Sequence, residues 1–326
     1  MATRSSFYAQ ISANKRNSFL MAAVVVIILG LLGFAIGYAV VGSPAGGVLA
    51  TGLALAFGSI TGLATYFSGD KLVLTVSGAR EVDEASAPQL MNVVREMAIA
   101  ANVPMPKVYI IDDSAPNAFA TGRDPAHASV AITTGLLEKL DREELQGVVA
   151  HELSHVRNLD IRFSLIVGVM VGSIAILADF FLRFTFWGGV SGRRSNRDSG
   201  GGAAAVIAIL AIVLAILAPI VSRLIQLAVN RQREYLADAS AVELTRNPYG
   251  LERALAKIGG DQEVLEVANR GTQHMYFTNP FKKFEARASG MMGTHPPILD
   301  RINRLRELTG EPSVQASEAA GLAGLE

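Results

Sequence analysis

A long stretch without charge constrains this chain more than any other feature of its sequence. Residues 17–69 contain no Asp, Glu, Lys or Arg. About 20 helical residues cross the hydrocarbon core of a bilayer, so this stretch is long enough for two spans. Glycines, a serine and a proline at residues 42–47 interrupt it near its middle. We therefore expect a hairpin of transmembrane helices at residues 18–41 and 48–67. A cleavable signal peptide is the alternative, but the segment is long for one.

Basic residues flank this hairpin on one side of the membrane. Lys15 and Arg16 precede the first span, Lys71 and Arg80 follow the second, and the connecting loop carries no charge. Because cytoplasmic loops are enriched in Lys and Arg, we expect the N-terminus and the chain after Asp70 to lie in the cytoplasm.

A second apolar pair follows at residues 163–182 and 203–221. Its first member contains Asp179, which Arg183, four residues on, can neutralise as an ion pair near the interface. A functional intramembrane acid is the alternative for Asp179. The connecting loop, residues 187–202, carries three arginines, which breaks the positive-inside rule if the loop is external. Whether this pair crosses the bilayer or forms a buried or re-entrant hairpin therefore stays open.

The composition excludes several classes of protein. The chain has no cysteine, so a disulfide framework, a thiolate metal site and a cysteine nucleophile are all excluded. Any metal must be held by His and carboxylate side chains. With 29 basic and 29 acidic residues the net charge is zero, and no basic stripe of a nucleic-acid-binding protein is present.

The soluble parts predict a mixed domain and a helical one. Strands are expected at residues 72–77, 107–112 and 128–133, and a helix at 87–101. A further helix should run from the N-cap Asp141 to about Asn158, with Glu144 completing a capping box. The second part is expected to be helical, with breaks at residues 247–248, 259–260 and 295–297.

The sequence His151-Glu-Leu-Ser-His155 predicts a zinc site on that helix. Histidines at positions i and i+4 project from one face and can share one Zn²⁺ ion, while Glu152 points toward a metal-bound water. Such an arrangement hydrolyses amides, since the carboxylate takes a proton from the water and passes it to the leaving amine. Two histidines on an ordinary surface helix are the alternative.

A third ligand has to come from elsewhere. The metzincin pattern is excluded because Asn158 and Ile161 occupy its glycine and third-histidine positions. Glu234 and Asp238 lie four residues apart on a predicted helix, so Glu234 could bind zinc while Asp238 accepts the N–H of a ligating histidine. A solvated ion-pair face is the alternative. The competing ligands are His127, His274 and His295.

Topology is consistent with this site. An even number of membrane crossings must separate His155 from Glu234, and the second apolar pair supplies two or none.

Taken together, four motifs resemble the HtpX-type membrane zinc metallopeptidases, relatives of the CAAX prenyl endopeptidases. They lie at residues 117–122, 151–155, 231–238 and 294–297 and keep their order along nearly the whole chain. The resemblance implies a mainly α-helical membrane protein with a gluzincin-like zinc metalloprotease domain, a small β-sheet and four apolar transmembrane helices. It also implies a bacterial cytoplasmic (inner) membrane protein with its site facing the cytoplasm. Its expected role is cleavage of misfolded or damaged membrane proteins in the stress response.

The metal-binding roles transfer residue by residue. The resemblance implies that His151, His155 and Glu234 hold one Zn²⁺ per subunit. It implies that Glu152 is the catalytic carboxylate and that Asp238 lies behind a histidine ligand.

The remaining roles concern substrate and transition state. Asn117, Ala118 and Phe119 resemble an edge strand that binds an extended peptide by β-addition. His295 resembles a histidine that stabilises the oxyanion, with a turn residue before a proline as the alternative. Arg231 either pairs with an active-site carboxylate or faces solvent.

The expected organisation has five parts: an N-terminal hairpin (1–69), a first protease part (70–160), a second hairpin (161–222), a second protease part (223–310) and a disordered tail (311–326). The expected partners are polypeptide or membrane-protein substrates and the lipid bilayer, without nucleic acid. The oligomeric state is left open. A catalytically silent scaffold or chaperone-like adaptor is the main alternative, and a transporter and a prenyl-protein processing enzyme are the others.

Overall fold

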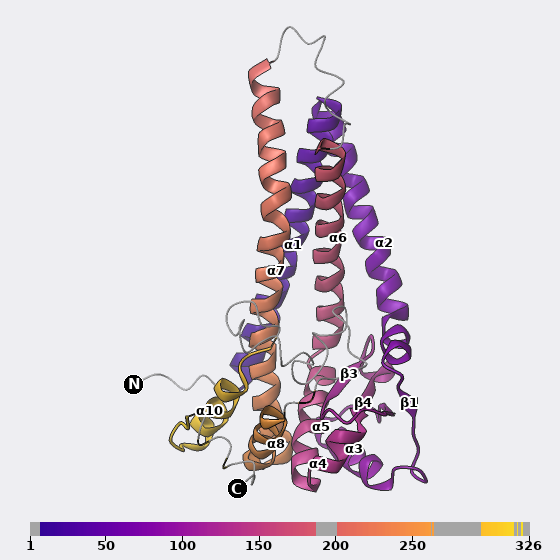
Figure 1. The fold of residues 1–326 in the computed structure, drawn as a ribbon, viewed down its shortest axis with the longest axis vertical. Helices are drawn as coiled ribbons and strands as arrows, with labels where there is room; N and C mark the ends of the chain where they lie inside the picture. The colour runs from indigo at the N-terminus through magenta and orange to yellow at the C-terminus, as the bar shows by residue number, and fades with distance from the viewer. Residues whose placement is uncertain are drawn as a thin grey trace. The chain divides into compact units, whose positions relative to one another are not determined.

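The structure is a computed structural model that describes residues 7–186, 201–261, 263, 295–315, 318 and 321. It is mainly helical with one small sheet (Figure 1), as the sequence predicts. The helices are α1 (Phe7–Val41), α2 (Pro44–Val76), α3 (Pro88–Ala101), α4 (Thr134–Lys139), α5 (Arg142–Arg157), α6 (Asp160–Phe186), α7 (Gly201–Thr245), α8 (Pro248–Gly260) and α10 (Ile298–Thr309). The strands are β1 (Arg80–Glu81), β2 (Lys107–Ile111), β3 (Ala118–Thr121) and β4 (Ser129–Thr133), and a short 3₁₀ helix covers Pro125–His127.

The chain divides into two compact units. One comprises Ser12–Tyr66 and Ser164–Val229 and holds the apolar parts of α1, α2, α6 and α7. The other comprises Phe67–Phe163 and Asn230–Glu326, with a short N-terminal segment, and holds the sheet and the remaining helices. Each unit is therefore assembled from pieces that are distant in the sequence.

The apolar unit begins with a tightly packed hairpin of α1 and α2. A Cβ atom placed on Gly37 would lie only 2.4 Å from the Ala50 Cβ atom, so the glycine lets the two backbones approach. The Thr51 hydroxyl donates a hydrogen bond to the Gly30 carbonyl across the hairpin at 3.3 Å. The reversal between the helices occurs at Gly42, whose φ of 75° is accessible to glycine at little cost.

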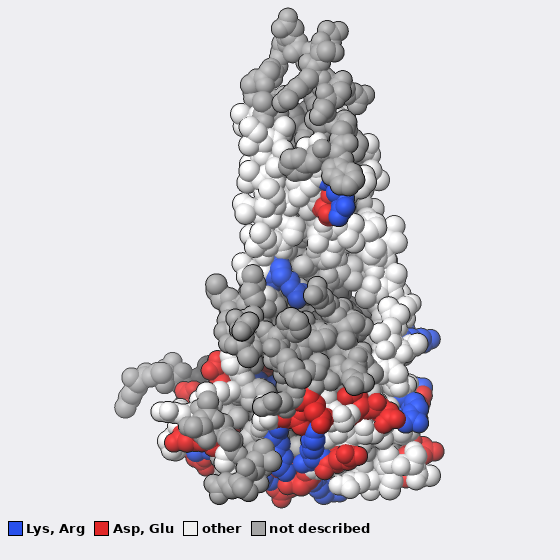
Figure 2. All heavy atoms as spheres, in the orientation of Figure 1, with Lys and Arg blue, Asp and Glu red and all other residues white. Residues whose placement is uncertain are grey.

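Three helical segments in the described part of the chain are long and apolar enough to cross a membrane. They are Phe19–Val41, Pro44–Val76 and Ala208–Thr245. Many of their apolar side chains are exposed, and in Figure 2 the upper parts of the apolar helices show few Lys, Arg, Asp and Glu side chains on the visible face. An exposed apolar surface of this extent suits a lipid environment. The fourth apolar run lies in α6, for which crossing of the bilayer stays a prediction.

The predicted ion pair of α6 is present. Arg183 donates from Nε to Asp179 Oδ2 at 2.7 Å, one helical turn away. The arginine-bearing loop that follows lies almost entirely outside the described residues.

The other unit is organised around a four-stranded mixed sheet in the order β1-β2-β4-β3. Strand β2 pairs with β4 in parallel, whereas β3 runs antiparallel to β4, with Phe119 opposite Ala131. β3 is therefore the last strand of the described sheet, and this position matters for the site.

Helix α5 lies between α3 and α8 and packs against β3. Its start is fixed by the predicted capping box, because the Asp141 carboxylate accepts from the Glu144 N–H and the Glu144 carboxylate accepts from the Asp141 N–H, both at 2.9 Å. Leu145, Val148 and Leu153 are buried in the main core of this unit. A cap at the first turn and an apolar face along its length therefore stabilise α5.

One predicted strand is wrong. Residues 72–77 were expected to alternate as a strand, but they form the end of α2 instead. Val73 and Leu74 are neighbours in sequence, yet both are buried against Ile111 and Phe119 of the sheet. In a strand, adjacent side chains would point to opposite faces, and only one of the two could be buried there. Burial of both side chains therefore favours the helix, although the segment has a high β-propensity.

The other predicted elements are found with small changes. The helix expected at residues 87–101 is α3, which ends where Asn102 adopts a left-handed φ of 53°. The strands expected at 107–112 and 128–133 are β2 and β4. The breaks at 247–248 and 259–260 separate α7 from α8 and end α8. Of the expected disordered tail, the first residues are described, and the Asn303 side chain accepts from the Val314 N–H at 2.8 Å.

Candidate metal and catalytic centre

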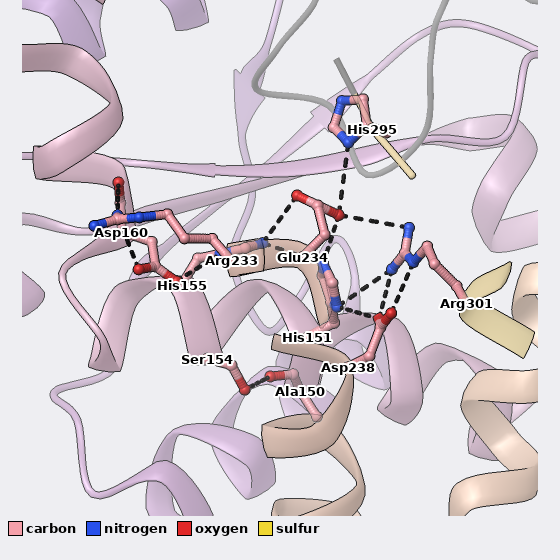
Figure 3. A network of polar contacts seen from close by, with 10 residues as sticks. All are labelled: Ala150, His151, Ser154, His155, Asp160, Arg233, Glu234, Asp238, His295 and Arg301. Atoms are coloured by element: carbon pink, nitrogen blue, oxygen red, sulfur yellow. Dashed lines mark hydrogen bonds and ion pairs between the residues drawn. The ribbon is translucent and has the colours of Figure 1, made fainter. Parts of the chain in front are cut away.

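Helix α5 and helix α7 bring together the three side chains expected to hold zinc. His151 and His155 lie one turn apart on α5, with their Nε2 atoms 3.1 Å from each other. The Glu234 carboxylate of α7 faces both rings, with Oε2 3.6 Å from His151 Nε2 and Oε1 3.6 Å from His155 Nε2 (Figure 3). Within the described residues these three form a group whose ligand atoms all lie within 4.8 Å of one another.

This arrangement fits a zinc ion by two tests. Zn²⁺ binds imidazole nitrogen and carboxylate oxygen at about 2.0–2.2 Å in tetrahedral geometry, which places neighbouring ligand atoms about 3.3 Å apart. The separations of 3.1 and 3.6 Å between the three side chains match that spacing. In addition, Glu234 Oε2 is buried and has no hydrogen-bond partner among the described residues. Arg301 Nη1 lies 3.6 Å from this oxygen, beyond hydrogen-bond distance, so the oxygen remains able to bind a metal ion.

The first histidine is oriented by a carboxylate that an arginine holds in turn. His151 Nδ1 lies 2.9 Å from Asp238 Oδ1, as expected for a carboxylate behind a zinc ligand. Arg301 of α10 donates to Asp238 from Nε at 2.9 Å and from Nη2 at 2.6 Å. Because the Nδ1–H of His151 is directed to Asp238, its Nε2 keeps the lone pair that a metal requires.

The second histidine has an equivalent support. His155 Nδ1 lies 3.1 Å from Asp160 Oδ2, and Arg233 Nη1 lies 2.9 Å from Asp160 Oδ1. Both rings therefore present Nε2 toward Glu234.

Glu152 lies between the two histidines in sequence and is almost completely buried, with 2% of its surface exposed. Burial raises the pKa of its carboxyl above the usual range, although the neighbouring histidines and a hydrogen bond from the Ala120 N–H act in the opposite direction. A carboxyl with a raised pKa is a better acceptor for a proton from water than an ordinary one. The donor Ala120 belongs to β3, so the acid and the last strand of the sheet are in direct contact.

The predicted substrate strand is β3, which lies next to Glu152, but its side chains are not exposed. Asn117, Ala118 and Phe119 are all buried, and Phe119 packs in the core. The Thr133 N–H donates to the Asn117 carbonyl at 3.0 Å, which places Asn117 in the hydrogen-bonded pairing with β4. Because hydrogen-bonding direction alternates along an antiparallel strand, the backbone groups of Ala118 and Ala120 point away from β4.

His295 is placed next to the group without joining it. Its side chain is 6% exposed, its Nδ1 lies 3.5 Å from Glu234 Oε2, and neither ring nitrogen has a hydrogen-bond partner among the described residues. Of the other competing ligands, His127 bonds to Asp124 on the 3₁₀ turn, and His274 lies outside the described residues.

The arginines that contact the carboxylates of the site were missed by the sequence reasoning. It named Arg231, which lies on α7 with its side chain partly exposed. Arg233 and Arg301 hold Asp160 and Asp238 instead. Asp160 was missed too, although its position five residues after His155 was a usable signal. Arg301 offered no such signal, because 63 residues separate it from Asp238.

Fold and site together define a membrane-bound zinc metallopeptidase. The sequence profile of peptidase family M48 matches residues 84–309, and the chain belongs to this family. It is 44% identical to the protein named protease HtpX homolog of Ligilactobacillus salivarius (strain UCC118), over 92% of this chain and 99% of that one. It is 45% identical to the protein of the same name from Listeria monocytogenes serotype 4a (strain HCC23), again over 92% and 99%.

Among solved structures, the crystal structure of S. mikatae Ste24p is similar, with a TM-score of 0.48 and 19% identity. The match covers 78% of this chain and 57% of that one. The predicted resemblance to HtpX-type zinc metallopeptidases is thus confirmed, as is the prediction of a zinc-dependent enzyme.

Proposed function

We propose that this chain cleaves misfolded or damaged membrane proteins from the cytoplasmic side of a bacterial inner membrane, as part of membrane protein quality control. The observation that carries the proposal is the group formed by His151, His155 and Glu234 with Glu152 buried beside it. The long apolar helices support a membrane location. The basic residues that flank the first hairpin support a cytoplasmic site.

The chemistry is divided between the metal and the chain. When bound, the zinc ion would act as a Lewis acid that polarises the peptide carbonyl and lowers the pKa of a coordinated water. Glu152 accepts a proton from the attacking water and delivers it to the leaving amine. His295 lies on the opposite side of Glu234 from α5 (Figure 3) and donates a hydrogen bond to the oxyanion that develops on the substrate.

The substrate lies along β3 as an additional antiparallel or parallel strand. The outward carbonyl groups of Ala118 and Ala120 supply the hydrogen bonds, because the Ala118 N–H already donates to Asn117 and the Ala120 N–H to Glu152. The contact between Ala120 and Glu152 places a bound peptide next to the catalytic carboxylate. Recognition through backbone groups explains how one site can accept many unfolded sequences. Asn117 fixes the start of the strand, because its side-chain oxygen accepts from the Ala118 N–H at 3.0 Å.

The test of the mechanism replaces Glu152 with Gln in the full chain purified in detergent. We expect turnover of an unfolded membrane-protein substrate to fall by about 10²–10⁴-fold while zinc content stays at the wild-type level. Glu138→Gln, an exposed position on α4, is the matched control and should be as active as wild type. Undiminished metal-dependent cleavage by the Glu152→Gln protein would overturn the assignment of the catalytic residue.

The substrate strand is tested separately with peptides. N-methylation of alternate backbone amides removes the hydrogen bonds that β-addition needs, so one of the two registers should raise KM strongly and the other should not. Equal cleavage of all N-methylated peptides would exclude binding along β3. The rival function, a catalytically silent scaffold, has no described feature in its favour, since the chain retains Glu152 and the three ligands.

A further inference from the structure

We infer that Arg233 is a positioning residue of the zinc site, which acts on the metal through Asp160 and His155. The inference deepens the proposed function and rests on the assignment of His155 as a ligand. It assigns to Arg233 control over the affinity for zinc and over the geometry of the bound metal.

Arg233 holds Asp160 at two points. Its Nη1 atom lies 2.9 Å from the side-chain Oδ1 of Asp160 and donates to the backbone carbonyl of the same residue at 3.0 Å. The two side chains are nearly completely buried, with 7% and 5% of their surfaces exposed. A single guanidinium nitrogen therefore fixes both the rotamer and the backbone of Asp160.

The guanidinium is itself held by an aromatic ring. Its central carbon lies 3.8 Å from the centroid of the Phe163 ring, at a distance typical of a stacked cation. Arg233 thus contacts both Asp160 and Phe163, and the ring limits the motion of the guanidinium that holds Asp160. Asp160 in turn contacts His155, whose Nδ1 lies 3.1 Å from Asp160 Oδ2.

The backbone before Asp160 adopts a strained conformation. Leu159 has a φ of 59°, in the left-handed region that a leucine rarely adopts. This conformation turns the chain between the end of α5 and the start of α6, and it brings Asp160 back toward His155. Backbone strain of this kind persists where the surrounding structure enforces it.

A zinc ligand needs this support for a physical reason. An imidazole that donates its Nδ1–H to a fixed acceptor keeps Nε2 free and aimed at the metal. If Arg233 is removed, Asp160 loses its buried partner and can rotate away, and the ring of His155 then loses its orientation. Glu234 follows Arg233 directly in sequence, so one turn of α7 delivers both a ligand and the support of another ligand.

The experiment measures zinc affinity of the full-length protein in detergent by competition with a chromophoric chelator. Arg233→Met keeps the length and apolar contact of the side chain but removes its charge and hydrogen bonds. We expect its zinc affinity to be about 10–100-fold weaker than that of wild type. Arg233→Lys keeps a buried cation but lacks the planar guanidinium that stacks on Phe163. Its zinc affinity should lie between those of Arg233→Met and wild type.

Arg157→Gln is the matched control. Arg157 on α5 and Glu243 on α7 form an ion pair at 3.3 Å and so connect the helices that carry the ligands, but they touch no ligand. We expect its zinc affinity to stay within about twofold of wild type. An equal loss in Arg157→Gln and Arg233→Met would show a general tie between helices and overturn the positioning role.

Three further measurements separate the possible failures. If Arg233 acts through Asp160, Arg233→Met adds little to the loss caused by Asp160→Asn, whereas fully additive losses would overturn this route. The absorption spectrum of the Co²⁺-substituted protein should change in Arg233→Met and not in Arg157→Gln.

Wild-type zinc affinity in His155→Ala would overturn the metal site itself. Loss in His155→Ala with wild-type affinity in Arg233→Met would overturn the positioning role alone.

Discussion

Arg301 donates two hydrogen bonds to Asp238, at 2.9 and 2.6 Å, and its Nη1 atom lies 3.6 Å from Glu234 Oε2. This arginine is 1% exposed and comes from α10, whereas both carboxylates belong to α7. It balances two buried negative charges next to the zinc site. The last described long helix is therefore part of the centre rather than a peripheral addition.

Replacing Arg301 by Met should destabilise the protein strongly. Removing one member of a buried ion pair leaves the other charge uncompensated, and we expect the free energy of unfolding to fall by about 3–5 kcal/mol. Chemical denaturation in detergent measures this change. Arg95→Gln breaks an exposed ion pair with Glu84 and should cost less than about 1 kcal/mol. Comparable losses in both variants would contradict the role of Arg301.

Zinc uptake should release a proton. Burial would lower the pKa of His155, but hydrogen bonds to Asp160 and Glu234 outweigh it and raise the pKa to about 10. In the metal-free protein this histidine is charged at pH 7, so its stabilising effect is complete below about pH 6.5 and is lost as the pH rises through about 10. A metal requires the neutral ring, so zinc affinity should rise with pH in this window.

Calorimetry in buffers of different ionisation enthalpy checks this prediction. We expect about one proton to be released per zinc at pH 7. His127→Gln should leave this number unchanged, because His127 lies outside the ligand group. Zinc binding without proton release would show that His155 is already neutral before the metal arrives.

Gly147→Ala should destabilise the fold at the contact of α5 with α8. A Cβ atom at Gly147 would lie 2.7 Å from the Leu251 backbone nitrogen and 2.8 Å from its Cα, so the two helices would have to separate. Overpacking of this kind costs about 1–3 kcal/mol. Gly172 on α6 has no atom within 4 Å of such a Cβ, and Gly172→Ala should be neutral or slightly stabilising. The melting temperature should therefore fall in Gly147→Ala and stay the same or rise slightly in Gly172→Ala.

His295→Gln should separate catalysis from metal binding. If His295 stabilises the oxyanion, kcat falls by about 10²–10³-fold while zinc affinity is unchanged. Steady-state kinetics together with chelator competition give both quantities. A parallel loss of zinc would instead make His295 a metal ligand, which was one of the alternatives at the level of sequence.

The helix that carries His151 and His155 could be predicted because its signals are local. The cap at Asp141 and the apolar positions of α5 lie within sixteen residues. The same holds for β2 and β4, whose β-prone runs are short and bounded by loop residues. The strand predicted at 72–77 was wrong because the conformation of this segment depends on where Val73 and Leu74 pack. The surface that they pack against is formed by residues far along the chain.

The supports of the site could be predicted only in part. Asp238 was found because it shares a helix face with Glu234. Arg233 and Arg301 were not, since an arginine in a helix is usually solvated and nothing in the local sequence marks it as buried. The position of Asp160 near His155 depends on the left-handed turn at Leu159, and a leucine in the sequence does not predict such a conformation.

The order of the site residues along the chain sets when the enzyme can become active during its synthesis. His151 and His155 leave the ribosome well before Glu234, and the apolar segments of α6 and α7 lie between them. Arg301 follows only near the end of the 326-residue chain. A nascent chain therefore has no complete centre until both apolar segments and α10 have been made. The order of the chain thus couples completion of the hydrolytic centre to synthesis of the apolar segments that precede Glu234.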